Sequence, residues 1–397
     1  MGLLAVLDHF YDNQTDESFE IEYRLESWGE IYSPFLGDRE HSTAARFILR
    51  EFPVRLFSVS TPYSEIPQKL CLTFRAPFQT KQFGNVTSSS LQENETAKEF
   101  SAFLSVVTRR RVFAIGKTRD SGLPVETKSE IYIRSHQQEP QLMVEFEPEY
   151  FYRLLKNLKY MNRHIAEGFI IAIRLYHSAI EMIYTEPDFA YLFLVMSLEA
   201  ISSAVYENFS IEDDKEIEQY LNSSYPGWKS LCDLSTPERK SQTIQMLLSK
   251  AYFVQRKFRE FVYNYLPKKF WTDIEDNAKP EYISTFIGVG PDGRGREEFI
   301  HSDKTIQEFE KIDRNRKKLQ KTLDAIYTAR SKLVHEGKKL PASIVLGLYR
   351  YLPFDAINEA ITTTSEHKSF GIPPLITLER LVSYTLVEFL NRKEPVN

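Results

Sequence analysis

Two side chains near residue 330 are of the types that act on phosphate esters. Arg330 carries a guanidinium that stays charged and presents a planar fork of donors to phosphate oxygens. His335 follows after four residues and has an ordinary pKa of about 6.5, so it can exchange a proton near neutral pH. From residue types alone, a buried structural ion pair is the more usual explanation of Arg330, and an ordinary histidine at a helix end is the more usual explanation of His335.

A predicted helix over Thr305–His335 positions this pair. Its apolar residues recur on one stripe, and Arg330 lies on that stripe, four residues after Ile326. An arginine on an apolar face is unusual unless it is paired or lies at an interface. At about 100° per residue, His335 lies roughly 140° around the helix from Arg330. The two side chains can therefore flank one groove, above all if a second copy of the helix packs against the first. Gly337 is the expected C-terminal cap.

The segment Ile326–Gly337 reads Ile-Tyr-Thr-Ala-Arg-Ser-Lys-Leu-Val-His-Glu-Gly. It resembles the signature of HEPN (higher eukaryotes and prokaryotes nucleotide-binding) domains, and it looks closest to their Apea-like branch. The shared pattern is Tyr-x-x-Arg-Ser-Lys, a hydrophobic residue and Val-His-x-Gly, with four residues between arginine and histidine. A second stretch, Phe193–Ile201, is similar to the early helix of these domains that carries a Leu-Glu-Ala step. The resemblance covers about residues 150–392.

The resemblance implies a metal-independent endoribonuclease that works as a homodimer without a cofactor, with two Arg-His pairs meeting across a cleft. RNA carries its own nucleophile, the 2′-OH, so such an enzyme needs a proton acceptor, a proton donor and a cation for the charged phosphorane. The resemblance assigns Arg330 to the scissile phosphate and His335 to proton transfer or leaving-group stabilisation. The products would be a 2′,3′-cyclic phosphate and a 5′-OH.

Three further residues are candidates for supporting roles. Glu199 is either an orienting partner of Arg330 or a carboxylate satisfied at the surface. Tyr327 belongs to the shared pattern. Ser331 stands where many active members of the family have Asn, Asp or His, and a hydroxyl hydrogen-bonds less extensively than these groups. No metal site is expected, because the two cysteines of the chain have no metal-ligand spacing.

Basic residues outside the pair are candidates for contacting RNA. Arg294 and Arg296 lie in an expected polar loop, and Lys332 lies on the predicted helix. The same loop region contains Gly288–Gly293, which matches G-x-G-x-x-G. A dinucleotide site needs a strand, a turn and a helix, whereas the sequence predicts a plain turn between helical segments. The run Arg109–Arg111 is interpreted as a solvated helix end, with a phosphate-contacting patch as the alternative.

The composition is that of an average soluble globular protein, since 42% of the 397 residues are hydrophobic and 26% are charged. The chain has 50 Lys and Arg against 55 Asp and Glu, a net charge of −5. Nucleic acid must therefore meet a local basic patch or groove instead of a uniformly basic surface. The longest apolar stretch, Phe189–Tyr206, is short for a membrane span and is interrupted by Glu199. We expect a buried helix of a cytoplasmic protein that has no membrane association.

The expected fold class is α+β, with a strand-rich mixed N-terminal domain at residues 1–146 and an all-α HEPN-like helical bundle at residues 147–397. Alternation of apolar and polar residues predicts strands at Phe19–Tyr23, Arg55–Ser60, Lys69–Phe74, Glu130–Arg134 and Gln141–Phe146. Helical spacing predicts helices at Thr96–Ile115, Pro148–Tyr184, Phe189–Tyr206, Thr236–Leu266 and Thr305–His335, and a last helix that opens with Pro373 and Pro374.

The resemblance implies a biological role as a toxin or anti-phage effector of the abortive-infection kind. The N-terminal domain would then sense a phage-derived or protein trigger, or hold the nuclease in check. The alternative is a non-catalytic HEPN-type helical module that binds a partner or RNA without cutting it. A third reading, a nucleotide-dependent enzyme built on Gly288–Gly293, predicts that nucleotide stays bound on purification, and we expect none.

Overall fold

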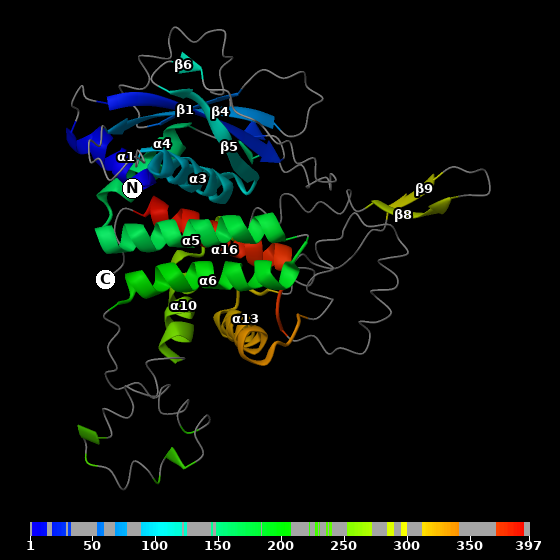
Figure 1. Cartoon of the computed structure of the whole chain (residues 1–397). Coiled ribbons are helices and arrows are strands. Elements are labelled where there is room, and N and C mark those ends of the chain that lie inside the picture. Colours follow the sequence, from blue (N-terminus) through cyan, green and yellow to red (C-terminus); the bar gives the residue numbers. More distant parts are fainter. Residues whose placement is uncertain are drawn as a thin grey trace.

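The structure is a computed structural model with an antiparallel sheet near the N-terminus and packed helices after it, which makes the fold α+β (Figure 1). The strand expected at Glu130–Arg134 lies outside the residues that the structure describes. The described residues are 2–13, 18–28, 31–32, 54–58, 68–77, 89–120, 123–124, 144–145, 148–183, 185–207, 252–271, 284–289, 295–299, 312–340, 371–392 and a few single positions between 222 and 239.

The main sheet has the strand order β3-β4-β1-β5-β6, and its paired strands are antiparallel. On the central strand, Ile21, Tyr23 and Leu25 alternate with polar residues and are buried. The strands expected around Phe19–Tyr23, Arg55–Ser60 and Lys69–Phe74 are confirmed. Their bounds are β1 Ser18–Trp28, β3 Val54–Ser58, β4 Gln68–Pro77, β5 Arg111–Asp120 and β6 Leu123–Pro124. Two short strands, β2 (Ile31–Tyr32) and β7 (Val144–Glu145), form a separate parallel pair, so the strand expected at Gln141–Phe146 is present over two residues.

Helix α3 (Ser89–Thr108) lies between this sheet and the helices of the second half (Figure 1). The N-terminal helix α1 (Leu3–Asp8) packs against α3 and continues into a π-helical turn, His9–Asn13. The helix expected at Thr96–Ile115 therefore ends early, and its last residues belong to β5. The physical reason is Arg109, whose φ of 54° lies in the left-handed region and cannot continue a right-handed helix.

The interpretation of the run Arg109–Arg111 as a solvated helix end is wrong. Arg109 forms a two-pronged ion pair with Glu379 of α16 (Leu375–Asn391), and the two side chains are 17% and 5% exposed. Tyr176 donates its hydroxyl to the same carboxylate. Arg110 is 5% exposed. These contacts bind the end of α3 to the helical half of the chain.

The helical pattern expected over Pro148–Tyr184 forms two helices, α4 (Pro148–Tyr160) and α5 (Arg163–Met182). The break comes at Asn162, which has a non-helical ψ of 134°. Its side-chain oxygen accepts the backbone N–H of His164 at 3.0 Å and caps the second helix.

Helix α6 (Pro187–Val205) packs along α5, as Figure 1 shows. The two helices approach closely at Gly168, where a Cβ atom would lie only 2.7 Å from Cβ of Ala204. Ser197 donates its hydroxyl to the carbonyl of Ala172 at 2.7 Å and fixes the same pair of helices. A small residue at position 168 is thus required for this packing.

Among the described residues, α6 alone is long and apolar enough to cross a membrane by length and composition. Half of its apolar window is buried inside the protein. It contacts α5, α16, α10 (Tyr252–Tyr265) and α13 (Arg316–Glu336). Helix α10 lies within the segment expected to be helical at Thr236–Leu266. Helix α13 begins at Arg316, so the helix expected at Thr305–His335 is wrong over residues 312–315, which are described and not helical because Asn315, with a ψ of 122°, caps the helix.

Both ends of α13 are capped. The side-chain oxygen of Asn315 accepts the N–H groups of Lys317 and Lys318 at 3.0 and 3.4 Å. The other end stops at Gly337, whose φ of 63° lies in the left-handed region, so the predicted glycine cap is confirmed. These two local signals set the first and last residues of α13, and they therefore set the positions of residues 330 and 335 along the helix.

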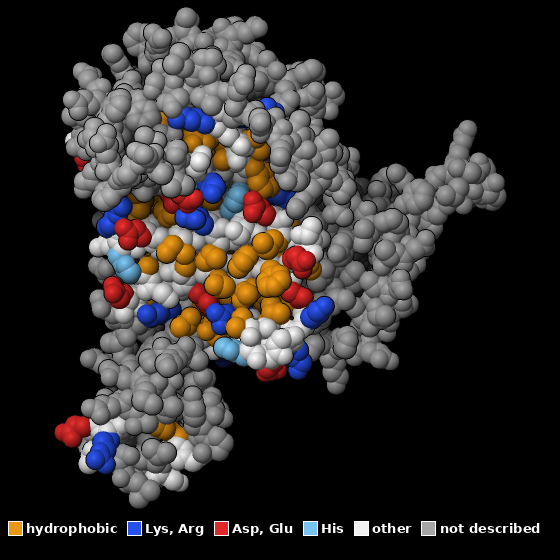
Figure 2. All heavy atoms as spheres, viewed as in Figure 1, with side chains coloured by type: hydrophobic (Ala, Val, Ile, Leu, Met, Phe, Trp, Pro, Cys, Tyr) orange, Lys and Arg blue, Asp and Glu red, His pale blue; other side chains and the backbone are white. Residues whose placement is uncertain are grey.

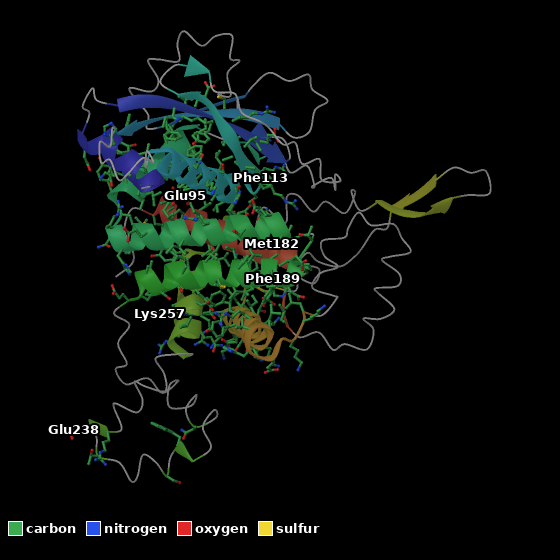
Figure 3. The ribbon with its side chains drawn as sticks, viewed as in Figure 1. Glu95, Phe113, Met182, Phe189, Glu238 and Lys257 are labelled. Atoms are coloured by element: carbon green, nitrogen blue, oxygen red, sulfur yellow. The ribbon has the colours of Figure 1, made fainter. Side chains whose placement is uncertain are left out.

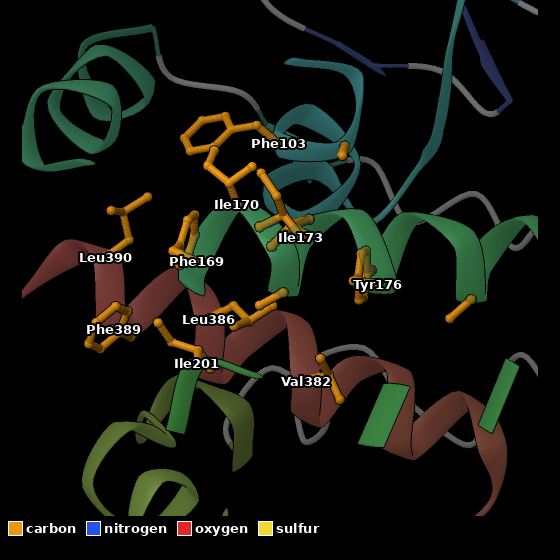
Figure 4. Packing of buried hydrophobic residues seen from close by; sticks show 14 of the residues in the cluster. Phe103, Phe169, Ile170, Ile173, Tyr176, Ile201, Val382, Leu386, Phe389 and Leu390 are labelled. Carbon is orange, nitrogen blue, oxygen red and sulfur yellow. The ribbon is translucent and has the colours of Figure 1, made fainter. Parts of the chain in front are cut away.

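One hydrophobic cluster joins the sheet, α3 and the helices of the second half. In Figure 4, Leu386 and Phe389 of α16 lie next to Phe169 of α5. The rings of Phe169 and Phe389 stack with centroids 6.2 Å apart. The strand-rich part and the helical part therefore share one core.

A two-stranded hairpin, β8 (Ser284–Val289) and β9 (Gly295–Phe299), lies in the half of the chain expected to be all-α. The all-α prediction for residues 147–397 is wrong for these two strands, the first of which contains β-favouring residues such as Thr285 and Phe286. The helical neighbours predicted for Gly288–Gly293 are also wrong. The next described element after β8 is the strand β9 and not a helix, whereas a dinucleotide site needs a helix after its turn. The turn expected at Pro291–Gly293 lies outside the described residues.

Candidate functional site

Helices α6 and α13 carry the candidate site, and two hydrogen bonds hold them together. Tyr191 donates its buried hydroxyl to the carbonyl of Ile326 at 2.8 Å. Asp188 accepts the N–H of Leu340, just beyond α13, at 2.9 Å. The spacing of Asp188, Tyr191 and Glu199 places all three on one face of α6. This face is the one on which the C-terminal half of α13 rests.

Arg330 and Glu199 form an ion pair across the two helices. The guanidinium Nη2 donates to the carboxylate Oε2 at 3.1 Å, and the side chains are 21% and 12% exposed. The guanidinium carbon also lies 5.9 Å from the ring centre of Tyr327, one turn earlier on α13. Glu199 is therefore a partner of Arg330 and not a carboxylate satisfied at the surface, and its role in orienting the guanidinium for a reaction stays a prediction.

The pair leaves hydrogen-bonding capacity unused. Glu199 Oε1 and Arg330 Nε are buried and have no hydrogen-bond partner among the described residues. Burial raises the pKa of Glu199 above its ordinary value, because the loss of hydration outweighs the stabilisation of the carboxylate by Arg330. Buried polar atoms are nearly always paired in proteins, so these two atoms mark a place where a ligand group or water could bind.

His335 lies in the last turn of α13 and is exposed. The imidazole of His335 makes no hydrogen bond or ion pair with any other described residue. Its position is five residues from Arg330, which corresponds to about 7.5 Å along the helix and roughly 140° around it. Within one chain, the structure thus places the two residues on the same helix end but not against each other.

The other predicted site residues have different outcomes. Ser331 and Lys332 are half-buried beside Arg330 on α13, and neither side chain has a hydrogen bond or ion pair with the described part of the chain. Arg296 lies in β9, away from α13 in sequence, and its side chain is outside the described atoms. Arg294 lies outside the described residues. The structure therefore brings together Glu199, Tyr327 and Arg330, together with their neighbours on α13.

Sequence reasoning missed the residues that dock the two helices, Asp188 and Tyr191. Tyr191 is fully buried, and burial without a charged partner raises the pKa of its hydroxyl. Its spacing of eight residues from Glu199 was the available signal, since it places both on one helix face. The carbonyl that Tyr191 binds, that of Ile326, lies one turn before Arg330, so the tyrosine supports the site indirectly.

A pocket of about 540 Å³ opens elsewhere, between α5, α3 and the first residues of the chain. Its two arginines are already paired, Arg163 with Glu167 and Arg174 with Glu99. Among the described residues, no group of three or more His, Cys, Asp or Glu side chains is placed to hold a metal ion. None of the residues that line this pocket is among the predicted site residues, so the Glu199–Arg330 pair stays the candidate site.

Comparisons with protein-family models, with curated proteins and with solved structures found no match for this chain. The case for a function therefore rests on the side chains of α6 and α13.

Proposed function

We propose that this chain is a cytoplasmic, metal-independent endoribonuclease of the HEPN type that works as a homodimer. The observation that carries the proposal is the Arg330–Glu199 pair with its two unpartnered buried atoms. Buried arginine nitrogens without a partner also occur elsewhere among the described residues, as in Arg24, which is paired with Glu26. A buried carboxylate oxygen without a partner occurs among them at Glu199 alone, and such an atom is costly in a purely structural pair. An exposed histidine on the same helix end supplies a group that can transfer protons.

In the proposed reaction, the 2′-oxygen of RNA attacks the adjacent phosphorus, and the bond from phosphorus to the 5′-oxygen breaks. One His335 accepts the proton of the 2′-OH, and His335 of the other subunit donates a proton to the leaving 5′-oxygen. Arg330 binds the non-bridging oxygens, and Glu199 acts as a positioning residue that holds the guanidinium. Two subunits are needed, because one α13 directs its arginine and histidine to different sides.

The partner in this proposal is a second copy of the chain, packed on an apolar face of α5 and α6. Figure 2 shows apolar side chains gathered over these two helices. Ile171 and Phe189 are each 54% exposed, and Figure 3 shows Met182 and Phe189 next to each other at one end of the helix pair. The face consists of Ile171, Leu175 and Met182 of α5 and Phe189, Phe193 and Met196 of α6.

This apolar face borders the candidate site, because Met196 of the face lies one turn before Glu199 on α6. A further exposed apolar side chain, Val334, precedes His335 and is 46% exposed. Contiguous exposed apolar surface is uncommon in monomers and marks interaction sites. A second copy seated here would bring two copies of α13 toward the same region, which the proposed reaction requires.

The proposed enzyme is tested with purified protein and 5′-labelled transfer RNA or single-stranded RNA. We expect cleavage by the unmodified chain and a loss of at least about a hundredfold in Arg330→Ala and His335→Ala, because general acid–base catalysis and charge stabilisation each contribute about that much. Glu336→Ala is the matched control, since this exposed residue adjoins His335. Equal rates in all four proteins would refute the proposed roles.

The proposed biological role, a toxin or anti-phage effector with a sensing N-terminal part, predicts that overproduction slows bacterial growth. The slowing should vanish in Arg330→Ala and His335→Ala. The second candidate function is a non-catalytic interaction module, which the exposed apolar face of α5 and α6 also supports. Equally benign wild-type and variant proteins, with labelled RNA left intact, would favour that module.

A further inference from the structure

A strip of basic side chains runs along the solvent side of α13. At 100° per residue, Lys317, Lys321, Lys332 and His335 lie within about 60° of one another around the helix axis. Lys317, Lys321 and His335 are exposed, and Lys332 is half-buried. Arg330 lies on the other side of the helix, against α6. The strip extends over 18 residues, or about 27 Å.

The strip begins beside cations that are interleaved with aromatic rings. The guanidinium carbon of Arg314 lies 5.8 Å from the ring centre of Trp271, and that of Arg316 lies 5.1 Å from the ring centre of Tyr263. Lys268, which is exposed, precedes the tryptophan by three residues. Sites for single-stranded nucleic acid have two components. One is a row of cations that follows the phosphate backbone, and the other is a set of aromatic rings on which the bases stack.

The local charge is opposite in sign to that of the whole chain. Residues 266–271 and 312–321 contain seven Lys and Arg and one carboxylate, Asp313, which is paired with a lysine of α13 at 2.7 Å. Asp324, further along the helix, is held by residues of α10. Glu260 of α10 is a further acidic neighbour of Tyr263. The positive excess on a chain of net charge −5 points to a polyanionic ligand.

We propose that this strip, with the cations around Trp271, binds the phosphate backbone of single-stranded RNA and leads it to His335. The proposal rests on the proposed function in its choice of RNA as the ligand. At about 3.4 Å per phosphate along one strand, 27 Å accommodates roughly eight nucleotides. The strip would then hold RNA on one side of α13, while Arg330 reaches the scissile phosphate from the dimer side.

The test measures binding apart from cleavage. The probe is a labelled single-stranded RNA of about 20 nucleotides whose 2′-hydroxyls are methylated, so that it lacks the nucleophile. Binding to the full chain is followed by fluorescence anisotropy at several salt concentrations. The variant is Lys317→Glu/Lys321→Glu. The matched control is Arg153→Glu/Lys156→Glu, which reverses two exposed charges on α4.

We expect the α13 variant to raise Kd at least about tenfold and to lower the slope of log K against log salt by about 1.4, since each phosphate contact on a single strand contributes about 0.7. The α4 variant should bind as the unmodified chain does. Equal Kd values for all three proteins would overturn the proposal. So would tighter binding of polyglutamate than of RNA, which would indicate an acidic protein partner.

The two proposals fail in different ways. In the first case, methylated RNA binds in a way that depends on Lys317 and Lys321, but ordinary RNA is not cleaved. This result would support the RNA-binding strip and refute the proposed nuclease activity. Cleavage of ordinary RNA at unchanged KM in Lys317→Glu/Lys321→Glu would keep the nuclease and refute the strip.

Discussion

Glu199 is the residue on which the candidate site depends most, because it both pairs with Arg330 and carries an unpartnered oxygen. Its raised pKa means that the folded chain holds a proton on this carboxyl at pH values where the unfolded chain has released it. The ion pair with Arg330 therefore forms fully only above the folded-state pKa. Loss of the pair on acidification would release the guanidinium from its position.

This carboxyl makes a measurable contribution to the pH dependence of stability. In the unfolded chain Glu199 titrates near 4.5, and in the folded chain at a higher pH. The free energy of unfolding of the unmodified chain, relative to Glu199→Gln, should thus decrease as the pH rises from 4.5 through the folded-state pKa, and then stay constant. Urea unfolding at a series of pH values measures the difference. A difference that increases over this range would show that the folded-state pKa is depressed.

The ion pair between Arg109 and Glu379 leads to a second prediction for single residues, which concerns the free energy of unfolding. Both side chains are largely buried, so Glu379→Ala leaves a guanidinium without its partner and should destabilise the fold by about 3–5 kcal/mol. Glu388→Ala, on the same helix, removes a more exposed pair with Arg392 and should cost less than about 1 kcal/mol. Chemical unfolding of both variants makes the comparison. Similar losses in the two would contradict a structural role for the buried pair.

At the scale of elements, the packing of α5 on α6 sets the surface on which α13 lies. Gly168→Ala would place a methyl group about 2.7 Å from Cβ of Ala204, so one helix must shift. We expect a loss of about 1–3 kcal/mol in the free energy of unfolding. The same substitution made together with Ala204→Gly should cost less, because the space is restored. Equal costs in the two backgrounds would show that this contact does not limit the packing.

Much of α13 could be predicted from the sequence, because the signals are local. They are the stripe of apolar residues along the helix, the position of Arg330 on that stripe and the glycine that caps the C-terminal end. For Glu199 the sequence left two alternatives, a partner of Arg330 or a carboxylate satisfied at the surface, because only the packing of α6 against α13 decides whether this carboxylate reaches the guanidinium. The early end of α3 could not be predicted in this way. Arg109 leaves the helical conformation and pairs with Glu379, 270 residues away, and no pattern near residue 109 records that contact.

Among the described residues, one hydrophobic cluster joins the sheet and the helices, and two of the five exposed large apolar side chains, Ile171 and Phe189, lie on the neighbouring helices α5 and α6. If a second copy covers this face, Ile171→Glu/Phe189→Glu should convert a dimer into a monomer, because buried unpaired charges oppose association. Sedimentation equilibrium measures the mass. Ile115→Glu is the control, since this residue of β5 is 38% exposed and lies outside the face. A dimer that survives the double substitution would exclude this face as the interface.

The chemical ends of the cleaved RNA test the central claim most directly. Labelled RNA is incubated with the purified chain in excess EDTA, and the fragments are analysed by mass spectrometry. Attack by the 2′-OH predicts fragments that end in a 2′,3′-cyclic phosphate and begin with a 5′-OH, and it predicts none when His335 is replaced by alanine. Intact RNA, or fragments with 3′-OH and 5′-phosphate ends, would contradict the proposal that Arg330 and His335 cleave RNA.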